Sequence, residues 1–355
     1  MRQDKSPVTR RQFSGLAIGA VVTSAVVLAG CSTDPKPLSA KDIAALEKAL
    51  GRKVVTPASG GEYDSARFIW NDLFDRRPAI IAPCQSAEDV AHCIAFARKN
   101  GLALSVRSGG HHPAGLAMND GGLVIDLSAM KEIEVDPVSR RVTVQPGVLV
   151  AEMDNATEVH KLVVPAAAYP GVGIGGMTLG GGQGWFHEFG MTSDNILAVE
   201  MVLADGRIVL VDKNSEPDLF WAIRGGGGSF GVVTSFELQA HPLPEITLGM
   251  FAYPMALAKD VGSKWREHAL EAAPDFASAF VFSRQPVPSI MMPVKTGRPQ
   301  NEAKIEFDRI RSFAKPVQEM VKPIGLLDFQ QLAGAGIGGG TRFRSEERRV
   351  GKECA

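Results

Sequence analysis

The chain has 355 residues, of which 45% are apolar and 22% are charged, so it is long enough to bury a sizeable core and to hold more than one domain. Its formal net charge is -1 with acidic and basic residues interspersed, which argues against a nucleic-acid partner and favours a small molecule. The four cysteines show no metal-ligand spacing, so neither a metal site nor a disulfide framework is predicted.

Residues 1–31 are expected to be an export signal. Arg10 and Arg11 precede the apolar run 16–29, as in a twin-arginine signal, and the run ends on Leu-Ala-Gly-Cys31, which resembles a lipobox. The run is too short to span a bilayer as a helix. The sequence therefore predicts export to the envelope, the periplasm or the medium by the twin-arginine machinery, with lipidated Cys31 as the only membrane contact. An uncleaved membrane anchor or a chance arginine pair is the alternative.

From residue 40 to residue 244 the pattern alternates between helices and short strands, which is typical of an α+β fold. Ser86 is the expected N-cap of one helix and Gly101 its stop. Prolines in the segment 242–244 break the chain, so a domain boundary is expected near 244. The expected elements are a helix at 40–50, a strand at 79–82, a helix at 87–100, strands at 102–107, 122–126, 132–135 and 141–145, a helix at 150–160, a hairpin of 198–203 with 207–211, a helix at 218–223 and a strand at 232–239.

Glycine is concentrated in three runs, at 109–122, 171–184 and 225–231. A pyrophosphate needs converging backbone N–H groups with no side chain in the way, and such runs supply them. One run alone could simply form tight turns, whereas three runs favour a phosphate-bearing ligand. None has the dinucleotide fingerprint of a doubly wound sheet or the pattern of a P-loop. His111 follows the first glycines, so its ring is expected to face whatever that loop holds.

Four motifs in the same order resemble the berberine bridge enzyme-like branch of the FAD-linked oxidoreductases. They are residues 106–111 (Val-Arg-Ser-Gly-Gly-His), 120–128, 171–185 and 218–234. The resemblance covers about residues 65–330. It implies the FAD-binding domain named after p-cresol methylhydroxylase (PCMH), an α+β fold whose two subdomains hold an extended FAD between them, followed by an incomplete α+β substrate domain.

The resemblance also implies how the chain is divided. The parts are the signal 1–31, a linker and N-terminal helix at 32–64, the PCMH-type domain at 65–244, a partial substrate domain at 245–341 and a tail at 342–355 that is non-native or disordered. The family's C-terminal region, which completes the flavin site, has no match here. A truncated or chimeric reading frame is expected, and a natural short member is the alternative.

Carried over position by position, the resemblance implies that the first glycine loop wraps the pyrophosphate and that the ring of His111 is bonded to the 8α-methyl group of the flavin. Some members attach the flavin a second time through a cysteine, but Tyr169 stands at that position, which implies a single link. The full expected FAD-binding set is Arg107, Ser108, Gly109, Gly110, His111, Gly115, Gly171, Gly173, Gly175, Gly176, Thr178, Gly181, Gly182, Gly231, Val232 and Val233.

The reaction implied is oxidation of a small hydroxylated compound or a sugar by hydride transfer to the flavin. Oxygen, a quinone and a redox protein all stay open as acceptors. Alcohol oxidation needs a general base, which in this family comes from the C-terminal part, so no catalytic residue is named. His187 and Glu188 are expected to lie on the surface. The alternative function is an exported lipoprotein or fragment that binds flavin without turnover.

Overall fold

The computed structural model describes residues 38–283 and 289–334, and the described residues from Ala40 onward form one compact unit. Arg10, Arg11, Cys31 and the tail 342–355, on which the export, lipidation and tail predictions rest, lie outside the described residues. Within those two ranges, no helix is long and apolar enough to cross a membrane.

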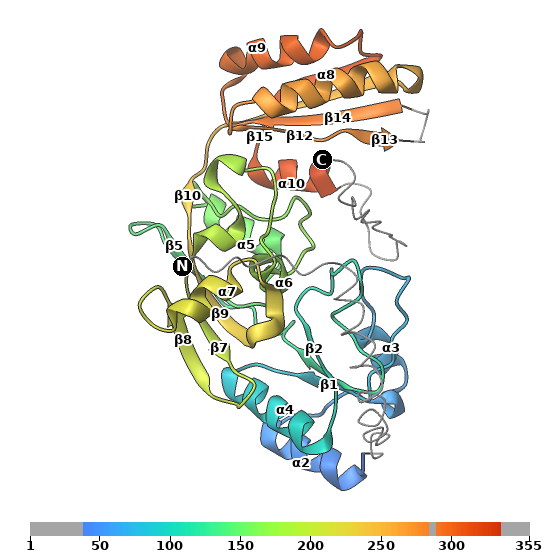
Figure 1. The fold of residues 1–355 in the computed structure, drawn as a ribbon, viewed down its shortest axis with the longest axis vertical. Helices are drawn as coiled ribbons and strands as arrows, with labels where there is room; N and C mark the ends of the chain where they lie inside the picture. The colour runs from blue at the N-terminus through green and yellow to red at the C-terminus, as the bar shows by residue number, and fades with distance from the viewer. Residues whose placement is uncertain (1–37, 284–288, 335–355) are drawn as a thin grey trace, which may run out of the picture. The chain divides into compact units, whose positions relative to one another are not determined.

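The first subdomain is built on a three-stranded parallel sheet with the strand order β1-β3-β2 (Figure 1). Helix α4 connects β1 to β2, and α2 packs against it. Ser86 caps α4 by accepting the N–H of Asp89, and Gly101 ends it with φ +64°. The elements are α2 (Ala40–Leu50), α3 (Gly61–Ala66), β1 (Ile80–Pro83), α4 (Ala87–Asn100), β2 (Leu104–Arg107) and β3 (Leu123–Asp126).

The second subdomain is a five-stranded antiparallel sheet with the order β4-β5-β9-β7-β8. Its buried face packs with α5, α6 and α7 into one apolar core that includes Val144, Met153 and Phe236. A two-stranded ladder of β6 and β10 lies beside it. The elements are β4 (Ile133–Asp136), β5 (Arg141–Val144), α5 (Val150–Glu158), β6 (Leu162–Val163), α6 (Ile174–Leu179), β7 (Ile196–Val202), β8 (Ile208–Asp212), α7 (Pro217–Ile223), β9 (Val232–Gln239) and β10 (His241–Pro242).

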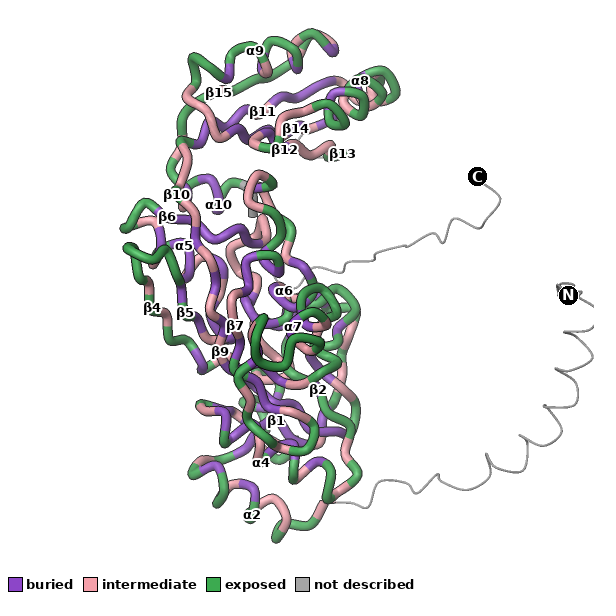
Figure 2. Tube along the Cα trace, turned by 60° about the vertical axis from the view of Figure 1, so that its left-hand side comes forward, coloured by how far each residue is buried: buried purple, intermediate pink, exposed green. Residues whose placement is uncertain are grey.

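The third part is a second five-stranded antiparallel sheet that begins at Ile246, with α8 and α9 over one face (Figure 1). Strand β11 is buried, whereas β15 at the sheet edge is mostly exposed (Figure 2). Helix α10 packs against α5 of the second subdomain. The elements are β11 (Ile246–Pro254), α8 (Ala258–Glu271), β12 (Phe276–Ser278), β13 (Val281–Ser283), β14 (Ser289–Thr296), α9 (Gln300–Arg311), β15 (Gln318–Ile324) and α10 (Leu326–Gly334).

The elements expected between residues 40 and 239 are confirmed, with ends that differ by a few residues. The second glycine run contains a helix, α6, that is not among the expected elements. Ile174, Thr178 and Leu179 are buried in this helix while Gly176 is exposed. Burial of that apolar side stabilises the helix despite the poor helix propensity of glycine.

Candidate functional site

The loop that carries His111 leaves the carboxyl end of β2 and is hydrogen-bonded to both subdomains. Arg107 donates from Nη1 to the carbonyl of Ala66 and lies 3.8 Å from the carboxylate of Asp126. The Ser108 hydroxyl donates to the carbonyl of Pro146 in the second subdomain. The loop therefore bridges the two subdomains.

The first two glycine runs touch each other at Gly109 and Gly173. A Cβ added to Gly109 would lie 2.5 Å from the backbone nitrogen of Gly173, and one added to Gly173 would overlap Gly109 and the Ser108 hydroxyl. A Cβ on Gly175 would meet Ser108 Cβ at 3.3 Å. Because any side chain at 109 or 173 would push the backbones apart, these two positions require glycine.

Several polar groups here suit an anionic oxygen ligand. The backbone N–H groups of Gly109, Gly110 and His111 donate to no backbone carbonyl of the described chain. Gly110 has φ +69°, which turns the loop so that successive N–H groups can converge. The Thr178 hydroxyl is fully buried and has no hydrogen-bond partner among the described residues. An oxygen-rich group such as a diphosphate fits these donors.

The ring of His111 contacts two aromatic side chains. Its centroid is 5.2 Å from that of Trp70, with the planes 22° apart, and 5.0 Å from that of Tyr169 at 45°. Burial lowers the pKa of His111. His112 is exposed, and its Nδ1 accepts the N–H of Ala114 at 3.1 Å. His111, rather than His112, therefore belongs to the site.

Three other predicted glycines, Gly115, Gly181 and Gly182, lie outside the contact between Gly109 and Gly173. Gly115 has φ +65° and packs against Phe74, while Gly181 and Gly182 have φ +118° and +75° in the turn after α6. The third glycine run reaches α6, because the N–H of Gly225 donates to the carbonyl of Leu179 at 3.0 Å.

Five members of the predicted set remain: Gly171, Gly176, Gly231, Val232 and Val233. Gly231, Val232 and Val233 make their described contacts with β7. Gly171 packs against Tyr169, and Gly176 has open space around it. The structure thus gathers residues 107–111 with residues 171–175 and Thr178 on the adjoining helix.

The expectation that Glu188 lies on the surface is wrong. Its side chain is only 15% exposed and forms a 2.7 Å ion pair with Lys295 of β14, which is fully buried. The Lys295 ammonium also lies 4.3 Å from the centroid of the Phe186 ring. Burial lowers the pKa of Lys295, and the bond to Glu188 opposes that shift. This pair could not be predicted from the sequence because its members are 107 positions apart. His187 is exposed, as expected.

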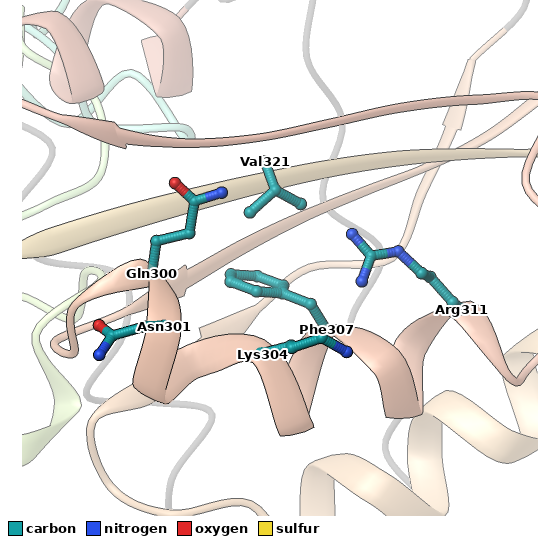
Figure 3. A pocket seen from close by; sticks show the side chains of 6 residues that line it. All are labelled: Gln300, Asn301, Lys304, Phe307, Arg311 and Val321. Atoms are coloured by element: carbon teal, nitrogen blue, oxygen red, sulfur yellow. The ribbon is translucent and has the colours of Figure 1, made fainter.

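Two cavities lie away from the glycine runs. One of about 530 Å³ is lined by residues of α9 and β15 (Figure 3): Gln300, Asn301, Lys304, Phe307, Arg311 and Val321. The other, of about 440 Å³, lies between the start of α4 and the five-stranded sheet of the second subdomain. Its lining includes Glu88, Glu132, Glu134 and Glu200, a charge that disfavours phosphate.

A family profile described as an FAD binding domain matches residues 78–212, which include β1 to β8 and the first two glycine runs. The chain contains the FAD-binding domain of a PCMH-type oxidoreductase. The match includes the first three of the four motifs, and it confirms the predicted FAD-binding domain. The (R)-6-hydroxynicotine oxidase of Paenarthrobacter nicotinovorans is 40% identical over 200 residues, which are 56% of this chain and 43% of that protein. The xylooligosaccharide oxidase of Thermothelomyces thermophilus is 32% identical over 252 residues, which are 69% and 50% of the two chains.

Solved structures of FAD-linked oxidoreductases share the fold. The 6-hydroxy-D-nicotine oxidase of Arthrobacter nicotinovorans superposes with a TM-score of 0.76 at 32% identity, over 82% of this chain and 65% of that one. A berberine bridge enzyme-like protein of Physcomitrella patens gives a TM-score of 0.77 at 23% identity, over 82% and 64%. The chain spans about half the length of the two sequence relatives named above.

Trp70 and Tyr169 complete the list of site residues. The sequence identified Tyr169 only as the residue that replaces a family cysteine, and it did not identify Trp70 at all. Both lie outside regular elements, so no hydrophobic period marks them. For Tyr169 the useful signal would have been an aromatic residue just before a glycine run, whereas Trp70 lies ten positions before β1 and has no such signal.

Proposed function

We propose that the protein to which this chain belongs is an exported FAD-dependent oxidoreductase that oxidises a small hydroxylated compound or a sugar. The observation that carries the proposal is the meeting of two glycine runs, at Gly109 and Gly173, beside the ring of His111. The relatives support the substrate class, since one is named for hydroxynicotine and another for xylooligosaccharides.

FAD fits the residues that are present. The N–H groups of Gly109, Gly110 and His111, which donate to no backbone carbonyl of the described residues, and the buried Thr178 hydroxyl would bind the diphosphate. When bound, FAD supplies a two-electron acceptor for a substrate carbon–hydrogen bond.

We propose further that His111 holds the flavin covalently, through a single bond. Burial lowers the pKa of His111, so its imidazole is neutral at pH 7 and offers a nitrogen lone pair. Bonding of that nitrogen to the 8α carbon would remove one N–H and one C–H hydrogen. Dioxygen would take up the two electrons and two protons and would leave as hydrogen peroxide. Tyr169, next to the ring, has no thiol for a second bond.

Export is part of the proposal and rests on Arg10, Arg11 and Cys31. Changing both arginines to lysine is expected to leave the precursor in the cytoplasm, because the translocase reads the arginine pair. Changing Cys31 to serine is expected to release the exported protein from membranes. Cell fractionation with an antibody measures both results, and normal export of the lysine variant would contradict the signal assignment.

Flavin reduction tests the oxidoreductase proposal. The full chain, purified with its flavin, is mixed anaerobically with 6-hydroxynicotine, xylobiose or a panel of other sugars, and the flavin absorbance is followed. Bleaching by one compound supports an oxidoreductase and identifies the substrate class. Retained flavin that no compound bleaches would favour the second candidate, a flavin-binding protein without turnover.

A further inference from the structure

We propose that Trp70 and Tyr169 form an aromatic clamp that positions the imidazole of His111 for attachment to the flavin. This inference rests on the proposed covalent link and adds the residues that hold the nucleophile in place. The three rings come from three separate segments: Trp70 precedes β1, His111 follows β2 and Tyr169 precedes α6. Only the tertiary fold brings them together.

Stacking, rather than hydrogen bonding, orients the His111 ring. Trp70 lies nearly parallel to it, with 5.2 Å between centroids and 22° between planes, and Tyr169 approaches at 5.0 Å and 45°. Among the residues that the structure describes, no hydrogen bond reaches the His111 ring. By contrast, His241 shares a 2.7 Å hydrogen bond with Asn195, and His112 accepts one from the N–H of Ala114.

Attachment to the flavin requires a ring nitrogen of His111 that no hydrogen bond occupies. A hydrogen bond usually fixes which nitrogen of a histidine carries the proton and occupies the other nitrogen. Here both nitrogens of His111 stay available for reaction while the stacked rings restrict the rotation of the side chain. Holding a nucleophile in one orientation raises its effective concentration toward a bound partner.

The backbone around the clamp keeps it aligned with the loop. The N–H of Trp70 donates to the carbonyl of Gly110 at 3.1 Å, and the Asn71 amide donates to the carbonyl of Pro113 at 2.6 Å. These bonds tie the Trp70 segment to the loop on both sides of His111. The position of the indole is therefore coupled to that of the imidazole.

Gly171 permits the third ring to approach. A Cβ added to Gly171 would lie 2.8 Å from Cε1 of Tyr169 and 3.4 Å from Nε2 of His111. A side chain at 171 would therefore wedge between the two rings. The clamp explains why glycine is required at a position where φ does not demand it.

The test compares variants that remove an aromatic ring with variants that keep one. In the full chain, Trp70→Ala and Tyr169→Ala are compared with Trp70→Phe and Tyr169→Phe, and Trp221→Ala is the matched control because its indole is 77% exposed. The first readout is the fraction of flavin that survives acid precipitation after a fixed incubation with FAD. The second is the rate at which diethylpyrocarbonate modifies His111 in the flavin-free chain, followed by mass spectrometry.

The clamp predicts that Trp70→Ala lowers the attachment rate by at least about tenfold, because loss of orientation lowers effective concentration. Trp70→Phe is expected to restore most of that rate, and Trp221→Ala to leave it unchanged. Non-covalent FAD binding should be retained in all of these variants. The His111 ring should react faster with diethylpyrocarbonate once an aromatic neighbour is lost.

Two other results would each overturn a different part of the proposal. Attachment at the wild-type rate in Trp70→Ala and Tyr169→Ala, with unchanged His111 reactivity, would overturn the clamp while leaving the covalent link intact. A wild-type chain that binds FAD but never attaches it would overturn the link itself, and the proposed role of the clamp with it.

Discussion

Replacing Asp154 with asparagine is expected to stabilise the protein at neutral and alkaline pH. Asp154 of α5 is 1% exposed and faces Gln330 of α10. Asp154 Oδ2 and Gln330 Oε1 are both buried with no hydrogen-bond partner among the described residues. Burial penalises the charged form of Asp154 more than the Gln330 amide stabilises it, so the α5–α10 contact favours a neutral Asp154 or an amide in its place.

The magnitude follows from the pKa of Asp154, which burial raises from 3.8 to about 7, while the Gln330 amide lowers it and the nearby Glu158 carboxylate raises it. Because the folded-state pKa lies above the unfolded one, the stabilising contribution of Asp154 is complete below about pH 4 and is lost as the pH rises toward 7. A shift of about three pH units at ~1.4 kcal/mol each corresponds to at most about 4 kcal/mol.

Urea unfolding at pH 5, 6, 7 and 8 measures this effect. The wild-type chain should lose stability between pH 5 and 7, whereas Asp154→Asn should show a shallower pH dependence and exceed the wild type at pH 8. Asp328→Asn is the matched control, because Asp328 lies on the exposed side of the same α10. Equal pH slopes in the wild type and Asp154→Asn, or an asparagine variant that is less stable at pH 8, would refute the reasoning.

Two further predictions concern the site and the contact beside it. Gly173→Ala should abolish flavin binding, since its Cβ overlaps the Gly109 backbone; flavin absorbance of the purified chain measures this, and a normal spectrum would contradict the close approach. Lys295→Met should cost about 3 kcal/mol in the free energy of unfolding by leaving Glu188 half-buried without its partner, and adding Glu188→Gln should recover much of the loss. Urea denaturation of the single and double variants tests this, and an additive double variant would argue against direct pairing.

Local chemistry made part of the fold predictable from the sequence. Ser86 caps α4 and Gly101 ends it. Both effects depend only on residues within one turn of the helix end, so they can be predicted without knowledge of the tertiary structure. The glycine runs were recognisable for the same reason, since close backbone approach demands glycine wherever it occurs. The loop at residues 107–111 could therefore be proposed from the sequence alone as part of a ligand-binding surface.

Tertiary contacts account for what the sequence did not reveal. The α6 helix forms inside a glycine run because its apolar side chains reach a core made by other segments. Trp70 and Tyr169 become site residues only when three loops converge on His111. Glu188, in the short helix His187–Phe189, is held out of solvent by its ion pair with Lys295 of β14. In each case the partner is distant in sequence, so periodicity and propensity carry no information about it.

In-gel flavin fluorescence after acid denaturation is the most direct test of the central claim, that His111 holds FAD where the two glycine runs meet. The wild-type chain, His111→Ala and the neighbouring control His112→Ala are purified from exporting cells, denatured in acid and run side by side. The account predicts a fluorescent band for the wild type and for His112→Ala, and none for His111→Ala. A fluorescent band in His111→Ala, or no flavin in either the band or the supernatant of the wild type, would contradict it.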